Sequence, residues 1–278
     1  MAEADCSYLK RIISKGTVYM CHSFTVYYPV FRTRRADCFR YDFDEAEIFR
    51  EKGGEQKRMR PVTKGEAPDQ ELKRYQDAEQ YLEERLGAYC SFCEMPISHV
   101  PEVEHKEAKT KGGEEMSWGN LLLSCKYCNT RKGTIVKRGD KEKYLWPDED
   151  DTFHAFLYED DIPKLNEEYL LLQGKQVRQK AENLFRLVKL DNIPFTPAVK
   201  DRRYAVRNEA RNYALGSKQG WDKIKKSAER EEYLQIIEML AQSSGFFSVW
   251  MNVFKDDMEV RQILINAFKG TKKEYCNG

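Results

Sequence analysis

Two Cys-x-x-Cys pairs, Cys90–Cys93 and Cys125–Cys128, lie 31 residues apart in a chain of 278 residues. The segment between them has only short apolar runs, so it cannot bury enough apolar surface to fold without an additional constraint. Four thiolates arranged in two such pairs are the usual ligands of a structural Zn²⁺ with closed tetrahedral coordination. The sequence therefore predicts a zinc ion that joins the two ends of this segment and leaves no open position for chemistry.

Cysteine usage and hydropathy limit where the chain is expected to work. The other cysteines lack paired spacing, and we expect free thiols at Cys6, Cys21, Cys38 and Cys276. No run of apolar residues reaches the ~18 needed to cross a bilayer, and the first thirty residues lack the pattern of a signal peptide. The sequence thus predicts a cytoplasmic protein without a membrane partner, in a reducing compartment where paired cysteines more often bind metal.

Three regions of the chain differ in pattern. Residues 1–58 hold the aromatic and β-branched run GTVYMCHSFTVYYP, which predicts one or two strands. Residues 59–145 begin with a helical pattern from Asp69 to Gly87 and continue into the cysteine segment. In residues 146–278 helical spacing dominates, with helices expected at 177–188, 233–240 and 258–268. The expected fold class is α+β, with a zinc-stapled core between a β-rich N-terminal segment and a helical C-terminal domain.

The residues around the cysteine pairs follow a specific order. The first pair is followed by EVEH (Glu102–His105), the loop KGGEE (111–115) and WGNLLL (118–123), and the second pair by Asn-x-x-Lys-Gly. Over about residues 60–136, this order resembles HNH endonucleases of the ββα-metal type with a four-cysteine zinc. The phrases RPV, EVEH and WGNLLLSC also resemble bacterial HNH proteins associated with phage defence, including nuclease subunits of Septu-type and retron-linked systems.

The resemblance implies a role for each polar residue of the motif. His105 matches the general base of the family, and Glu104 matches an acidic metal ligand that is commonly Asp. Asn120 matches the asparagine that orients the loop carrying the base. Asn129 matches a final position that holds His or Asn and binds the catalytic metal, which the resemblance implies to be a second ion besides zinc.

These residue types suit the hydrolysis of a phosphodiester, which needs an activated water and a cation near the phosphoryl oxygens. The imidazole of His105 can take a proton from water near neutral pH, because its ordinary pKa is about 6.5. Glu104 would point away from His105 on an ideal strand, so one site using both requires a local twist. Oxygen ligands from Glu104 and Asn129 favour Mg²⁺ or Mn²⁺ over zinc. Alternatively, Asn129 could cap the start of a helix.

Positive charge is local in this chain. The total of 47 Lys and Arg against 46 Asp and Glu gives no general case for a nucleic-acid partner. However, the segment from Glu104 to Lys143 contains ten Lys and Arg residues and only six Asp and Glu residues. We expect cations near the site to contact the sugar-phosphate backbone without reading bases. These cations are Lys106, Lys109, Lys126, Arg131 and Lys132.

The sequence therefore predicts metal-dependent cleavage of DNA, with RNA left open as a substrate. One alternative is a non-catalytic zinc-stapled module that binds nucleic acid or a protein. A compatible hypothesis is a defence subunit held silent until a partner ATPase or sensor responds, because nuclease chemistry does not need the helical C-terminal half. The motif-bearing part begins at Met59, so translation could also start there, which would make residues 1–58 an extension.

Overall fold

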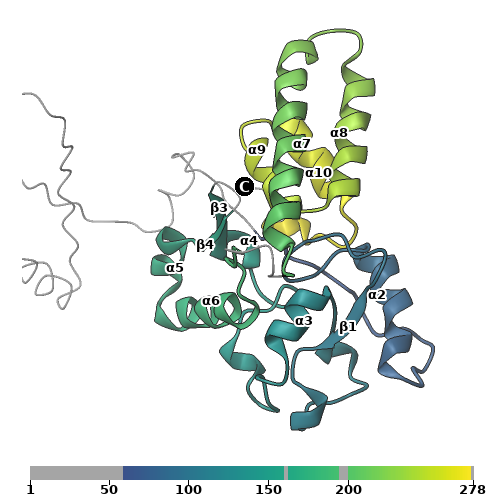
Figure 1. The fold of residues 1–278 in the computed structure, drawn as a ribbon, viewed down its shortest axis with the longest axis vertical. Helices are drawn as coiled ribbons and strands as arrows, with labels where there is room; N and C mark the ends of the chain where they lie inside the picture. Colours follow the sequence, from purple (N-terminus) through teal and green to yellow (C-terminus); the bar gives the residue numbers. More distant parts are fainter. Residues whose placement is uncertain (1–58, 160–161, 194–199, 277–278) are drawn as a thin grey trace, which may run out of the picture. The chain divides into compact units, whose positions relative to one another are not determined.

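A computed structural model describes residues 59–159, 162–193 and 200–276 of the chain. These residues belong to one compact unit. Helices and two two-stranded sheets make up the described part (Figure 1), which is the expected α+β class. The strands expected near the N-terminus lie outside the described residues. No helix of the described part is long and apolar enough to span a membrane.

The first half of this unit is a β-hairpin between helices. Strand β1 (Glu102–His105) pairs antiparallel with β2 (Leu121–Ser124), with Glu104 opposite Leu122 and His105 opposite Leu121. Helix α3 (Lys126–Lys132) follows β2 after one residue and packs against β1. The helix expected from Asp69 is shorter than predicted: α2 spans Ala78–Leu86, after the 3-10 turn η3 (Tyr75–Asp77).

That late start has a local cause. The carboxylate of Asp77 accepts the backbone N–H of Arg74 at 3.0 Å, so the first helical turn is capped at Arg74, five residues after the predicted cap at Asp69. Gly87 ends α2 as expected, since its φ of 73° is open to glycine at little cost. One face of α2, with Ala78, Leu82 and Leu86, is buried. Only the N-terminal boundary of this prediction was wrong.

The second half is mostly helical, as the spacing predicted. The predicted helices correspond to α6 (Lys175–Val188), α8 (Arg230–Ser244) and α10 (Met258–Ala267). The sequence reasoning missed the longest helix, α7 (Arg203–Ile224), which runs beside α8 as an antiparallel pair (Figure 1). It also missed three short helices and two strands: α4 (Thr152–Ala155), β3 (Phe156–Glu159), β4 (Ile162–Leu165), α5 (Glu167–Gln173) and α9 (Phe247–Val253).

The hydrophobic core crosses the predicted boundary between residues 145 and 146. One buried cluster runs from Met59 through β2 to α6 and includes both Leu145 and Trp146. Phe92 and Trp146 lie on opposite sides of that boundary in the sequence, and their ring centroids are 6.3 Å apart. Residues from both expected domains therefore pack into the same unit.

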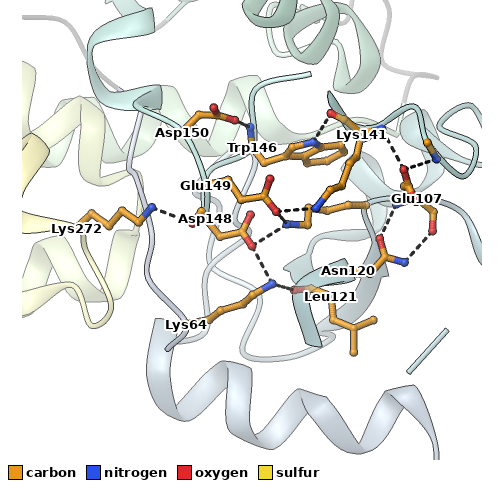
Figure 2. Close-up of polar contacts among 12 residues, drawn as sticks. Lys64, Glu107, Asn120, Leu121, Lys141, Trp146, Asp148, Glu149, Asp150 and Lys272 are labelled. Atoms are coloured by element: carbon orange, nitrogen blue, oxygen red, sulfur yellow. Dashed lines mark hydrogen bonds and ion pairs between the residues drawn. The ribbon is translucent and has the colours of Figure 1, made fainter. Parts of the chain in front are cut away.

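A buried charge network holds the end of the hairpin that carries His105 (Figure 2). The Asp148 carboxylate accepts from the ammonium groups of Lys64 at 2.8 Å and Lys106 at 2.9 Å. Lys106 follows His105 directly and also pairs with Glu149. Lys64 donates in addition to the carbonyl of Leu121, the residue opposite His105. We call these residues, Lys64, Lys106, Asp148 and Glu149, the Asp148 network.

We expect Asp148→Asn to lower the free energy of unfolding by about 3–5 kcal/mol, because it leaves two buried ammonium groups beside a neutral side chain. The matched control is Glu149→Gln, whose side chain is 39% exposed and which should cost about 1 kcal/mol or less. Urea unfolding followed by circular dichroism measures both changes. Equal losses for the two variants would contradict this assignment.

Candidate active site and zinc centre

The four cysteines of the two pairs converge in the interior. We call this group the four-cysteine site: Cys90, Cys93, Cys125 and Cys128. Their sulfur atoms all lie within 4.8 Å of one another, and Cys93 Sγ is 3.6 Å from Cys125 Sγ. Four sulfurs at a Zn–S distance of 2.3 Å stand about 3.8 Å apart in a tetrahedron. The arrangement therefore fits a single zinc ion, as the spacing predicted.

Burial explains why this group needs a cation. The cysteines are at most 1% exposed, and burial raises the pKa of the Cys128 thiol well above its ordinary value. Thiolates in such surroundings are stable only next to positive charge. Cys125 also caps α3, since its Sγ accepts the backbone N–H of Cys128 at 3.4 Å. The four-cysteine site thus fixes where α3 begins.

His105 ends β1 and is 6% exposed. Its Nε2 lies 3.0 Å from the carbonyl oxygen of Glu115, and its ring centroid is 4.6 Å from that of Tyr75. Because a carbonyl only accepts hydrogen bonds, Nε2 carries the proton in this contact and Nδ1 keeps its lone pair. Burial, followed by the charge of Lys109, lowers the pKa of His105 against the opposing effect of the Glu115 carbonyl. The imidazole is therefore neutral at neutral pH.

Asn120 braces the loop between the strands. Its Oδ1 accepts the backbone N–H of Glu107 at 2.8 Å, and its Nδ2 donates to the Glu107 carbonyl (Figure 2). Nδ2 also donates to the carbonyl of Glu114. The Asn120 carbonyl accepts the N–H of Lys106 at 2.7 Å. These bonds fix both sides of His105, from Lys106 to the segment that supplies the Glu115 carbonyl. Asn120 is predicted to orient the loop that carries His105, and that role requires backbone hydrogen bonds of this kind.

Glu104 of β1 contacts α3 through its carboxylate. Its carboxylate accepts from the Lys132 ammonium at 2.6 Å, and both side chains are buried. Burial raises the pKa of Glu104, and the charge of Lys132 opposes this rise. The charge of Lys132 also contributes to lowering the pKa of His105, so this ion pair lies within electrostatic reach of the imidazole. Within the described residues, the four-cysteine site is the group of His, Cys, Asp and Glu side chains near enough to hold a metal.

Asn129 lies inside α3, as its fourth residue. The cap of this helix is Cys125, so the alternative that Asn129 caps a helix is wrong. The Nδ2 of Asn129 donates to Glu102 Oε2 at 2.7 Å, which leaves Oδ1 as the atom that can coordinate a cation. Glu102 also pairs with Lys126 at 3.0 Å. The structure therefore joins Asn129 to Glu102, and Glu104 to Lys132.

Sequence reasoning overlooked Glu102 as a site residue. The signal was present, because Glu102 and Glu104 are two residues apart in an extended run and so face the same side. It also missed Tyr75, which packs on His105 from the turn before α2. No sequence pattern links Tyr75 to His105, since thirty residues separate them and only the fold brings them together.

The five cations predicted to contact phosphate divide into two classes. Lys109, Lys126 and Arg131 are exposed. Lys106 and Lys132 are fully buried, with their ammonium groups paired to carboxylates. The prediction of a backbone contact for these two residues is corrected, because a buried and paired ammonium presents no charge to a phosphate in solvent.

We expect one zinc per chain, with Cys93→Ser losing most of it and lowering stability, because a structural zinc contributes directly to folding free energy. Cys276→Ala is the control, since Cys276 is also buried but belongs to another part of the core. Elemental analysis and thermal unfolding measure both effects. Full zinc content in Cys93→Ser would contradict the assignment of the four-cysteine site.

Comparison with known families agrees with this geometry. Residues 90–134 match the family model described as HNH endonuclease. The match begins at the first ligand of the four-cysteine site and ends just after α3, so it covers β1, β2 and the whole predicted site. Comparison with curated proteins and with solved structures found no match. Residues 90–134, which hold the four-cysteine site, are therefore similar to HNH endonucleases.

Proposed function

We propose that the protein is a metal-dependent endonuclease that hydrolyses phosphodiester bonds in DNA, with His105 as the general base. The observation that carries this proposal is the contact of His105 Nε2 with the Glu115 carbonyl. It commits the ring to the tautomer in which Nδ1 is unprotonated. A neutral, oriented imidazole is what proton removal from water requires.

The buried surroundings of His105 support the same role. A lowered pKa keeps the base neutral before the reaction. The ring is held by Tyr75 on one face and by the Glu115 carbonyl at Nε2. When Nδ1 accepts a proton from water, that carbonyl stabilises the resulting imidazolium through the Nε2–H bond. Asn120 contributes by fixing the backbone at Glu107 and Glu114 on either side of this contact.

The donor atoms beside α3 fit a hard divalent cation such as Mg²⁺ or Mn²⁺. The carboxylate of Glu104 and the Oδ1 of Asn129 are oxygen donors, and Glu102 fixes the orientation of the Asn129 amide. Such a cation would neutralise charge on the phosphoryl oxygens. Lys132 now pairs with Glu104, so a cation at Glu104 must share the carboxylate with this ammonium or replace it. The charge of Lys132 opposes the rise in the pKa of Glu104 that burial causes, and so favours the ionised carboxylate that a cation needs.

The exposed cations Lys109, Lys126 and Arg131 would contact the sugar-phosphate backbone, which favours nucleic acid of any sequence. We extend the proposal to bacterial anti-phage defence, with an ATPase or sensor as partner, on the basis of the phrases RPV, EVEH and WGNLLLSC. Comparing cleavage by the isolated chain with cleavage in the presence of a co-encoded ATPase tests this extension. Full activity of the isolated chain would count against a silenced subunit.

We expect His105→Ala to lower the rate of plasmid cleavage with Mg²⁺ or Mn²⁺ by about 10²–10⁴-fold, the usual contribution of a general base. His99→Ala is the control, because His99 is exposed in the loop after the first cysteine pair. Parallel assays on single-stranded RNA distinguish the two substrates. Undiminished cleavage by His105→Ala would overturn the assignment, and retained nucleic-acid binding without cleavage by the native chain would favour the non-catalytic module.

Lys132→Met should make stability depend on divalent metal. Without its ammonium partner the buried carboxylate of Glu104 costs about 3–5 kcal/mol, and a bound divalent cation should recover much of that loss. Thermal unfolding of the zinc-loaded protein, with and without added Mn²⁺, measures this dependence. The control is Arg131→Met, which changes an exposed neighbour. A Mn²⁺ effect no larger in Lys132→Met than in the native chain would argue against Glu104 as a metal ligand.

A further inference from the structure

The C-terminal helices reach the four-cysteine site on both of its sides. Arg203, the first residue of α7, places Nη1 3.3 Å from Cys128 Sγ and is 1% exposed. On the other side, Glu94 directly follows Cys93 and accepts from the backbone N–H of Ser248 in α9 at 2.8 Å. The Ser248 hydroxyl donates to the same carboxylate at 2.6 Å. Each cysteine pair is thus held by a different helix of the C-terminal half.

The turn before α9 lies directly against the first cysteine pair. Gly245 has a φ of 69°, and a Cβ at this position would stand 2.7 Å from a ring carbon of Pro96. Such a distance excludes any side chain there. The N–H of Phe246 donates to the carbonyl of Glu94 at 3.0 Å. This close approach places α9 where Ser248 can bind Glu94.

Arg203 uses its whole set of donors. Nε donates to Asp201, and Nη2 donates to Asp201 and to the Lys189 carbonyl. Nη1 donates to the Val188 carbonyl at 2.8 Å and to Cys128 Sγ. A guanidinium has five N–H groups in a fixed plane, and each has an acceptor here. The side chain therefore joins the end of α6, the start of α7 and a zinc ligand in one rigid arrangement.

The chemistry of the four-cysteine site explains what this contact can do. Four thiolates around one Zn²⁺ carry an excess of negative charge in a buried place. An N–H donor directed at a coordinating sulfur delocalises part of that charge. Removing a group that bonds to a metal ligand typically lowers metal affinity by about 10–100-fold. Lysine cannot replace this arrangement, because its ammonium lacks the planar fork.

We propose that Arg203 is a positioning residue of the zinc centre that couples α7 to α3. Cys128 lies in α3 and directly precedes Asn129. The sulfur that Arg203 holds therefore sits next to the residue assigned to the second metal. Through this contact, the C-terminal helices form part of the structure that retains zinc and sets the position of Asn129.

The test measures zinc retention by the full zinc-loaded chain in competition with a chromogenic chelator. We expect Arg203→Met to bind zinc about 10–100-fold more weakly than the native chain. The zinc affinity of Arg203→Lys should lie between that of the native chain and that of Arg203→Met. The matched control is Arg207→Met, one turn further along α7 and equally buried, whose guanidinium lies over the rings of Tyr158 and Phe246. This control should leave zinc affinity unchanged.

A spectroscopic measurement separates an effect on the sulfur from a general loss of stability. With Co²⁺ in place of zinc, the sulfur-to-metal charge-transfer bands report the electron density on the thiolates. Removal of the N–H donor in Arg203→Met should shift these bands to lower energy, and Arg207→Met should not shift them. Neither readout uses nuclease activity, so failure of the proposed function and failure of this inference are distinguishable.

Two outcomes would overturn the inference. One is a folded Arg203→Met, judged by circular dichroism, with native zinc affinity and native Co²⁺ bands. The other is an equal loss of zinc affinity in Arg203→Met and Arg207→Met, which would assign the effect to burial alone. If Arg203→Met does not fold, Arg203→Lys decides: native zinc retention by that variant would also reject the coupling.

Discussion

Convergence of four buried sulfur atoms is the constraint on which the rest of this structure depends. Cys90 and Cys93 lie shortly after the end of α2. Cys125 caps α3, and Cys128 lies in the first turn of this helix. Holding these points together forces the intervening chain to turn back as the hairpin of β1 and β2. Burial of apolar residues such as Val103 and Leu122 in the core also contributes to that turn. A cation shared by the four thiolates would hold the two ends of the segment together.

Once the hairpin is fixed, β1 distributes its polar side chains between two environments. Glu102 and Glu104 face α3, where Asn129 and Lys132 meet them. His105 turns to the Glu115 carbonyl. The carboxylates and the imidazole thus differ in charge and in partners, although they are neighbours in sequence. The Glu104 carboxylate is paired with the Lys132 ammonium and the His105 imidazole is neutral, so the two groups differ in charge at the same pH.

The buried charges of this unit connect regions that are distant in sequence. Asp148 neutralises Lys64 and Lys106 at the end of the hairpin, and its carbonyl accepts the ammonium of Lys272 from the C-terminal end. Around the four-cysteine site, Glu94 accepts a hydrogen bond from Ser248 of α9, and Arg203 of α7 donates one to Cys128. These contacts make the helices after residue 146 part of the support for the segment that matches the HNH family model. The sequence pattern alone does not indicate this dependence, because each of these charged residues resembles an ordinary surface charge when its distant partner is unknown.

The sequence by itself determined the elements whose cause is local. Paired cysteines at close spacing predicted the four-cysteine site, the extended run EVEH predicted β1, and apolar periodicity predicted α6, α8 and α10. Only the tertiary structure decided the partners of the charged residues. It buried Lys106 and Lys132, joined Asn129 to Glu102, and brought Arg203 to Cys128 across 75 residues of chain. The physical reason is that local patterns encode backbone conformation and apolar faces, whereas the partner of a long charged side chain depends on the packing of distant elements.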